Sequence, residues 1–129
     1  MRTVRQRRGE FAEEIACEWL RRQGWQVLGR NVRVEPHDEI DLVAIDPAAP
    51  GVAVCVEVRS ARSREFGSPE ERVSARKIGS LYRAAQAFSR SERASQLGVG
   101  RLKVRVDLLV VDLRGTTPRI RHLKALEPA

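Results

Sequence analysis

Two runs of β-favouring residues, 40–45 and 54–59, constrain the fold of this chain more than any other feature. The first run carries Asp41 and the second carries Glu57, each inside an otherwise apolar stretch. The connecting residues 46–51 include an aspartate, two prolines and a glycine, a composition typical of a turn. The sequence therefore predicts a β-hairpin with one carboxylate in each strand.

The register of this hairpin decides whether the two acids meet. If Ile45 pairs with Ala53, then Asp41 lies directly opposite Glu57, with Cβ atoms about 5 Å apart. Two like charges at that distance destabilise a sheet unless a shared proton, a cation of the protein or a bound metal compensates them. A slip of one residue separates them, so this register is a hypothesis.

The buried acids have a structural and a functional interpretation. Aspartate in an apolar strand is rare unless it is paired or coordinated. Arg59 shares a strand face with Glu57 and opposes Glu39 in the same register, so ion pairs alone would explain the pattern. Carboxylates are also the ligands that Mg²⁺ prefers, with Mn²⁺ as the alternative ion. Such an ion binds a phosphate oxygen and lowers the pKa of an attacking water.

The charge of the chain favours polyanionic partners. Its 129 residues fit one domain spanning residues 1–129, and 24 basic against 17 acidic residues give a net charge of +7. Nucleic acid, DNA above all, is the first expected partner and an anionic membrane surface the second, while a basic but inert surface is the alternative. No apolar run approaches the roughly 18 residues that span a bilayer.

The remaining composition predicts a cytoplasmic protein. Cys17 and Cys55 lie far apart within apolar patterns, as buried thiols of a reducing compartment do. The basic residues at the N-terminus lack the apolar segment of a signal peptide. Neither histidine has partners in sequence, so His37 and His122 are expected at the surface.

Hydrophobic periodicity and turn residues predict the order α-β-β-β-α-β(-β), an α/β fold with a mixed central sheet flanked by helices. The first helix is expected to end at Gly24, the second to begin at Ser68 with Pro69 at its first position, and the first strand to bend at Gly29. The expected elements are a basic N-terminal tail over 1–8, a helix over 9–23, a strand over 25–34, the hairpin, a helix from 68 to about 90, a mobile loop over 91–103, and strands over 104–113 and 119–126.

Charged residues on the two helices extend the candidate site. On the first helix Glu13 falls at the flank of the apolar stripe, from where it reaches the sheet edge, whereas the other acids face solvent. Few aromatic residues accompany the basic ones, which argues against stacking of single-stranded bases and favours contacts to a duplex or branched backbone. The candidate nucleic-acid-binding residues are Arg62, Arg64, Arg72, Arg76 and Lys77.

An ordered set of motifs resembles the small bacterial YraN-like proteins of the UPF0102 type. The set comprises Ala12-Glu13 with Ala16, Leu20 and Gly24-Trp25, then Arg30-Asn31, Glu39-Ile40-Asp41-Leu42-Val43, Val56-Glu57-Val58-Arg59, Phe66-Gly67 with Pro69, Lys77 and Val106-Asp107. The resemblance covers roughly residues 9–113. It implies a single-domain restriction-endonuclease-like fold of the PD-(D/E)xK type, similar to Holliday-junction resolvases, and a homodimer by analogy.

The resemblance also assigns roles. Asp41 and Glu57 would bind the metal, Glu13 would assist, and Arg59 would stand at the catalytic lysine position. Arginine keeps its proton and cannot act as a general base, but it can hold a water or stabilise phosphate charge. Lys77 is the candidate replacement for the lysine.

Three functions remain open at this point. The first is a Mg²⁺-dependent endonuclease acting on DNA, including branched DNA. The second is a non-catalytic nucleic-acid-binding module with a degenerate site, and the third is a protein-interaction subunit of a cytoplasmic assembly.

Overall fold

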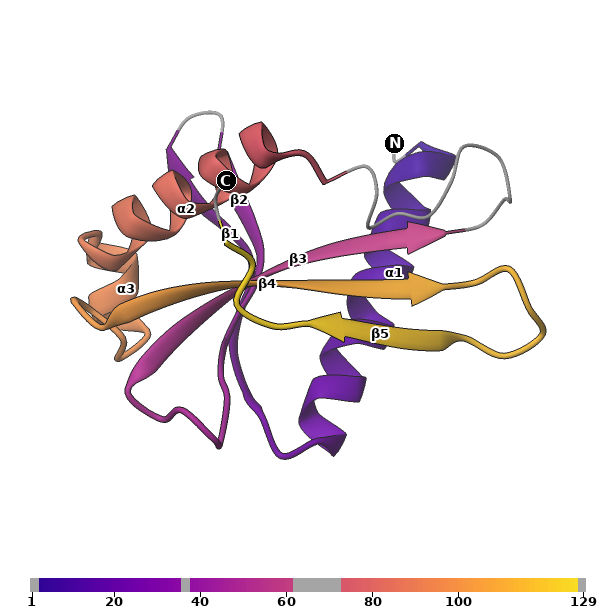
Figure 1. The fold of residues 1–129 in the computed structure, drawn as a ribbon, viewed down its shortest axis with the longest axis horizontal. Coiled ribbons are helices and arrows are strands. Elements are labelled where there is room, and N and C mark those ends of the chain that lie inside the picture. The colour runs from indigo at the N-terminus through magenta and orange to yellow at the C-terminus, as the bar shows by residue number, and fades with distance from the viewer. Residues whose placement is uncertain (1–2, 36–37, 62–72, 128–129) are drawn as a thin grey trace.

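The computed structural model describes residues 3–35, 38–61 and 73–127, and these form helices on both faces of a five-stranded sheet (Figure 1). The strands lie in the order β1-β2-β3-β4-β5, antiparallel except for the parallel pair β3–β4. The mixed α/β architecture and element order predicted from the sequence are confirmed. The elements are α1 (Val4–Arg22), β1 (Gln26–Glu35), β2 (Asp38–Ile45), β3 (Val52–Ala61), α2 (Ala75–Ser89), α3 (Glu92–Gln96), β4 (Lys103–Asp112) and β5 (Arg119–Leu123).

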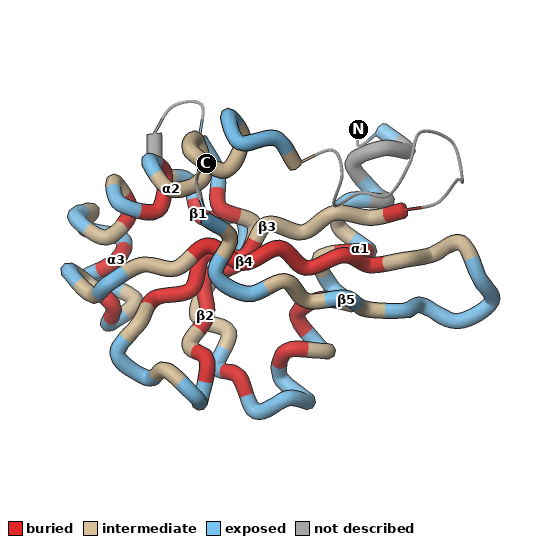
Figure 2. The backbone as a smooth tube through the Cα atoms, in the orientation of Figure 1, coloured by how far each residue is buried: buried red, intermediate tan, exposed pale blue. Residues whose placement is uncertain are grey.

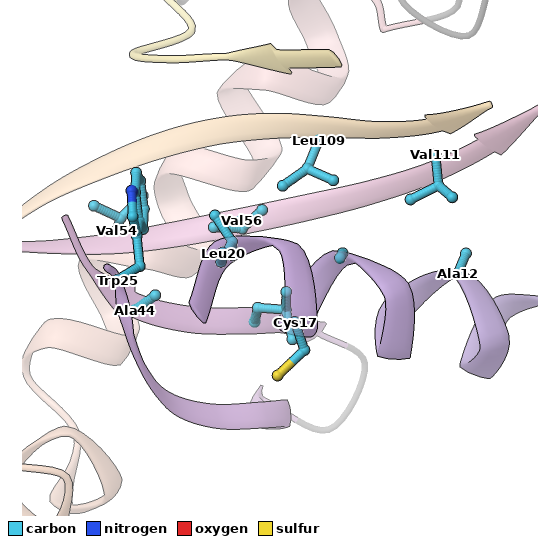
Figure 3. Close-up of a cluster of buried hydrophobic side chains, with 11 residues drawn as sticks. Ala12, Cys17, Leu20, Trp25, Ala44, Val54, Val56, Leu109 and Val111 are labelled. Atoms are coloured by element: carbon cyan, nitrogen blue, oxygen red, sulfur yellow. The ribbon is translucent and has the colours of Figure 1, made fainter. Parts of the chain in front are cut away.

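Each face of the sheet has its own apolar core. Side chains of α1 pack against one face, where Leu20 meets Val56 and Leu109 (Figure 3). On the other face α2 contributes Phe88, which packs in the cluster that contains Cys55. Neighbouring residues of β3 point to opposite cores because side chains alternate along a strand. The inner strands β3 and β4 are consequently the most buried part of the molecule (Figure 2).

The first helix is longer than the sequence predicts. It begins at Val4, so residues 4–8 form its first turns and the expected tail over 1–8 is wrong for that stretch. The N–H of Arg7 already donates to the carbonyl of Thr3 at 3.1 Å. Arginine and glutamine are good helix formers even without apolar periodicity, which explains the early start. The predicted stop is confirmed, because Gly24 takes φ +86° and closes the helix end.

The second helix begins later than expected. Ser74 caps it by accepting the N–H of Lys77 at 3.1 Å, and Val73 lies before the helix. The expected start at Ser68 lies outside the described residues. The helix ends at Ser89, close to the predicted end at Arg90.

The connection 91–103 contains a short helix. It contains α3, capped by the hydroxyl of Ser91, which accepts the N–H of Ala94 at 3.2 Å. Ala94 and Val99 are buried in the α2-side core. The loop expected over 91–103 is therefore wrong for residues 92–96, which form a helix because two apolar residues among the polar ones anchor it.

Smaller features follow the prediction. A bulge interrupts β1 between Val27 and Gly29, where the sequence predicts a bend. Cys17 and Cys55 are free and buried, as expected. In the described ranges, no helix combines the length and the apolar character needed to cross a bilayer.

Candidate functional site

The β2–β3 hairpin has the predicted register. Leu42 pairs with Val56 and Ala44 with Val54, and the same register carried one pair further sets Asp41 opposite Glu57. The regular ladder ends at the Leu42–Val56 pair. Beyond it, the N–H of Val58 donates to Oδ2 of Asp41 at 2.8 Å. The aspartate side chain thus takes the place of a backbone acceptor where the two strands separate.

Asp41 and Glu57 line one small depression beneath α2. Leu81 and Ala84 of the helix border the same space, which measures ≈ 10 Å³. That volume is about the size of a single water or a small ion. The two carboxylates therefore share a narrow, partly apolar site and not an open surface.

Burial and mutual repulsion change the acidity of Asp41. Its pKa rises from 3.8 to about 7, chiefly because burial disfavours the charged form and next because Glu57 is close. The hydrogen bond from Val58 opposes this rise without cancelling it. A proton on Asp41 near neutral pH is therefore one of the three compensating devices that the sequence allowed.

Arg59 lies beside the acid pair, at a longer distance than a close ion pair. Its Nε lies 3.5 Å from Oε1 of Glu57, an ion-pair distance at the outer limit of hydrogen bonding. The same Nε is buried and has no hydrogen-bond acceptor among the described residues. A buried guanidinium donor without an acceptor among the described residues thus lies next to Glu57.

Glu13 approaches from α1 on a hydrogen bond to Asn31. Burial raises the pKa of Glu13, while the bond to the Asn31 side chain opposes the rise. Its Oε2 is buried and lacks a partner among the described residues. Glu13, Asn31 and Glu39 line a second hollow of ≈ 400 Å³. Glu39 borders both hollows, so the helix acid belongs to the same acidic region as the pair.

The acids do not form a preassembled three-ligand cage. Among the described residues, no group of three or more His, Cys, Asp or Glu side chains converges closely enough to hold a metal ion. Asp41 and Glu57 remain a two-carboxylate donor set with Glu13 nearby. Asn31 belongs to the Arg30-Asn31 motif, but its hydrogen bond to Glu13 is not predicted from the sequence. Its φ of +49° marks a backbone position that asparagine tolerates better than most residues.

The predicted basic residues are only partly placed. Arg62, Arg64 and Arg72 lie outside the described residues. Arg76 is exposed at the start of α2. Lys77 is half-buried and precedes Leu81 and Ala84 by four and seven residues, so it shares the helix face that covers the acid pair. It does not itself line the depression.

A separate buried network surrounds Asp107 of β4. The carboxylate accepts two hydrogen bonds from Arg105, at 2.9 Å each, and the N–H of Ala125 at 2.9 Å. Nε2 of His122 lies 2.8 Å from Oδ2 of Asp107 and its side chain is 8% exposed, so the expected surface position is wrong. Asp107 sits in an apolar run as Asp41 does, but here every oxygen is satisfied, which identifies the network as structural.

The chain is similar in sequence to known proteins. The model of a family described as "Uncharacterised protein family UPF0102" matches residues 12–111. A UPF0102 protein of Syntrophotalea carbinolica is 36% identical over 114 residues, covering 88% of this chain and 85% of the relative. A UPF0102 protein of Desulforamulus reducens is 36% identical over 120 residues, covering 90% and 91%.

A solved structure was also found. Pyrococcus furiosus SfsA in complex with Ca²⁺ has 14% identity and a TM-score of 0.35. The match covers 88% of this chain and 60% of that one.

Proposed function

This chain belongs to the UPF0102 family, and we propose that it binds DNA and hydrolyses its phosphodiester bonds with a divalent ion held by Asp41 and Glu57. The observation that carries the proposal is the opposed acid pair under α2, in which Asp41 has a pKa of about 7. Two partly buried carboxylates in opposed positions are costly, and such a cost is typical of functional sites.

The donor set fits Mg²⁺ or Mn²⁺. Both carboxylates offer hard oxygen ligands, and Mg²⁺ characteristically takes one or two carboxylates from a protein. The raised pKa of Asp41, caused chiefly by burial and next by the charge of Glu57, means that the carboxylate is poorly stabilised by the protein alone, and a bound cation would stabilise it. Oε2 of Glu13, for which the described part of the chain offers no partner, adds a buried acceptor at the edge of the same region. When bound, the ion would stabilise charge on a phosphoryl oxygen and lower the pKa of a bound water.

The chain's own residues have distinct tasks in this proposal. Asp41 must lose its proton, and the N–H of Val58 fixes the orientation of the resulting carboxylate. Glu13, whose buried Oε2 has no partner among the described residues, would add negative charge at the edge of the site. Arg59 keeps its charge at every relevant pH, so its partly exposed guanidinium would stabilise negative charge that develops on a phosphate oxygen.

The nucleic-acid part of the proposal rests on charge. The net charge of +7 favours a polyanionic substrate, and Arg76 is exposed on the helix that covers the acid pair. Lys77 lies on the face that carries Leu81, one turn before it, where a flexible ammonium group can follow a phosphate. Branched DNA and a homodimer are part of the proposal by analogy with resolvases alone.

A second candidate is a DNA-binding module without turnover. The approach of Arg59 to Glu57, at 3.5 Å, favours it, because a resident cation can take the place of a metal. Replacing the arginine separates the two functions. If the protein is an endonuclease, Arg59→Gln should still bind the metal but cleave DNA more slowly than the wild type. If it is a binding module, the wild type should bind no metal, and metal binding should appear only in Arg59→Gln.

The first experiment is calorimetric titration of Mg²⁺ and Mn²⁺ into the wild type and the Asp41→Asn/Glu57→Gln double variant. We expect binding to the wild type and loss of binding in the double variant. The matched control Glu18→Gln/Glu92→Gln removes two exposed carboxylates and should bind as the wild type does. Equal binding in all three proteins would overturn the proposed metal site.

Cleavage is then tested on linear and branched DNA with the same variants. Turnover that requires both the ion and the acid pair supports the endonuclease. The binding module would be the function if the wild type binds DNA without cleaving it and binds no metal even when DNA is present.

A further inference from the structure

We propose that the β4–β5 hairpin contains a separate binding site for a backbone phosphate of nucleic acid, an inference that rests on the proposed DNA-binding function. The hairpin encloses a hollow of ≈ 530 Å³, larger than either depression at the acid pair. The residues that line it are Asp112, Arg114, Gly115, Thr116, Thr117 and Arg119.

One arginine of the hollow is held in a fixed orientation. Nε and Nη2 of Arg114 donate to the two carboxylate oxygens of Asp112 at 2.9 and 2.8 Å. The backbone N–H of Arg114 donates to Oδ1 of the same carboxylate at 3.0 Å. These contacts lower the pKa of Asp112 below its usual range, so the carboxylate stays ionised and offsets the charge of Arg114. The guanidinium plane at the base of the hollow is thereby set.

Arg119 supplies the uncompensated charge. It is the direct cross-strand partner of Asp112, and it is exposed. Within the described ranges, no ion pair of Arg119 is found, since the carboxylate opposite is occupied by Arg114. Arg121 also acts on Asp112 electrostatically, so three arginines surround one acid. The hydroxyls of Thr116 and Thr117 add neutral donors, which completes a set suited to a phosphate diester.

The hollow is placed to contact the same nucleic acid as the acid pair. Asp112 pairs with Ala61, and the N–H of Leu113 donates to the Ala61 carbonyl at 2.8 Å, which ties the hairpin to the end of β3. Ala61 lies four residues beyond Glu57, roughly 13 Å along the strand. A DNA strand advances about 3.4 Å per phosphate, so this span corresponds to about four nucleotides. The hairpin projects past the end of β3 (Figure 1), where a duplex could continue.

The alternative is that these arginines only protect an edge strand. Charged side chains on β5 would discourage pairing with another sheet, because β5 is the last strand of the sheet. Charged side chains at any position along β5 would protect the sheet edge in this way. The observed arrangement gathers two arginines and two threonines around one hollow at the end of the β4–β5 ladder, which edge protection does not require.

The test compares Arg119→Gln with Arg93→Gln. Both changes remove one exposed arginine, but Arg93 lies on α3 at the opposite end of the molecule (Figure 1). Binding of a labelled DNA duplex is measured by fluorescence anisotropy over a series of KCl concentrations, with Mg²⁺ titrated separately. Anionic lipid vesicles without nucleic acid serve as the competing polyanion.

We expect Arg119→Gln to weaken duplex binding roughly three- to tenfold and to reduce the salt slope by about 1, with unchanged Mg²⁺ affinity. Arg93→Gln should bind the duplex as the wild type does. Equal effects of the two variants would overturn the hairpin site and leave the proposed function standing. A wild type that does not bind the duplex, or that binds only vesicles, would overturn both.

Discussion

The backbone N–H of Val58 donates to the carboxylate of Asp41 at 2.8 Å, which joins β3 to β2 through a side chain at the point where their ladder has ended. This contact holds Asp41 toward β3, the strand that carries Glu57. The hydrogen bond favours the charged carboxylate, whereas burial and Glu57 favour the protonated form. The balance leaves Asp41 titrating near neutral pH.

Replacing Asp41 by asparagine should stabilise the protein at high pH only. The folded pKa of about 7 lies above the unfolded value of 3.8, so wild-type stability falls as the pH rises through this window. Asparagine keeps an oxygen for Val58 and carries no charge. We expect Asp41→Asn to raise the free energy of unfolding at about pH 8 by on the order of a few kcal/mol, and to change it little at about pH 4. Urea denaturation at both pH values measures this.

The control for this prediction is Glu18→Gln, which removes an exposed carboxylate of α1. It should give the same small change at both pH values. A gain in Asp41→Asn that does not depend on pH would show that Asp41 does not titrate in this window.

Metal affinity should depend on pH through the same group. A bound ion requires the deprotonated carboxylate, so protons and metal compete for Asp41. We expect Mg²⁺ affinity to rise roughly tenfold per pH unit below about pH 7 and to level off above it. Calorimetry in two buffers of different ionisation enthalpy would detect the released proton. An affinity that is constant from about pH 5 to about pH 8 would contradict this role for Asp41.

Truncation of Asp107 should be among the most destabilising changes in the chain. Asp107→Ala leaves Arg105 and His122 without their shared acceptor inside the fold. Breaking a buried charged pair in this way costs about 3–5 kcal/mol, which urea denaturation would reveal. The conservative Asp107→Asn should cost less, and the exposed Glu92→Gln should be neutral. A loss equal to that of Glu92→Gln would mean that the network contributes no stability.

The same network predicts acid sensitivity. Hydrogen bonds from His122 and Arg105 outweigh the effect of burial and lower the pKa of Asp107, and contacts with Ala48, Arg105 and Lys124 do the same for Asp46. A lowered folded pKa gives stability that is present above the unfolded value of 3.8 and is lost as the pH falls below it. Acid unfolding of Asp107→Asn should therefore be less steep than that of the wild type.

Gly29 should not tolerate a side chain. A Cβ at this position would lie 2.9 Å from Cγ2 of Val32 and 3.3 Å from Cδ1 of Leu97. Gly29→Ala should lower the free energy of unfolding by about 1–3 kcal/mol because the core around the β1 bulge is overfilled. Gly51→Ala is the matched control, since a Cβ there meets nothing within 4 Å. Equal thermal unfolding of the two variants would contradict the steric argument.

Local patterns predicted most of the sheet and the centre of the site. The alternation of 40–45 and 54–59 around a turn fixed one plausible register, and the pairing of Leu42 with Val56 confirms it. The early start of α1 was missed because a helix of polar, propensity-driven residues has no apolar period. The Asp107 network was missed because its partners, Arg105 and His122, come from two strands, although an aspartate inside the apolar run 106–111 was a signal of the same kind as Asp41.

The hollow in the β4–β5 hairpin could not be predicted, because it depends on whether Asp112 forms its ion pair with Arg114 or with Arg119. Asp112 pairs with Arg114, two residues away in sequence, and leaves Arg119 opposite it exposed. Sequence spacing allows either pairing equally well.

The parallel pairing of β3 with β4 has a consequence for the order of folding. Val52 pairs with Lys103, so closing this pair joins residues about fifty positions apart, a larger entropic cost than closing the short β2–β3 turn. We therefore expect the hairpin that carries Asp41 and Glu57 to form while both acids are still hydrated and their repulsion is screened by water. Dehydration follows only when α2 docks and Leu81 covers them. The repulsion between Asp41 and Glu57 therefore becomes strong only after the rest of the sheet has formed around them.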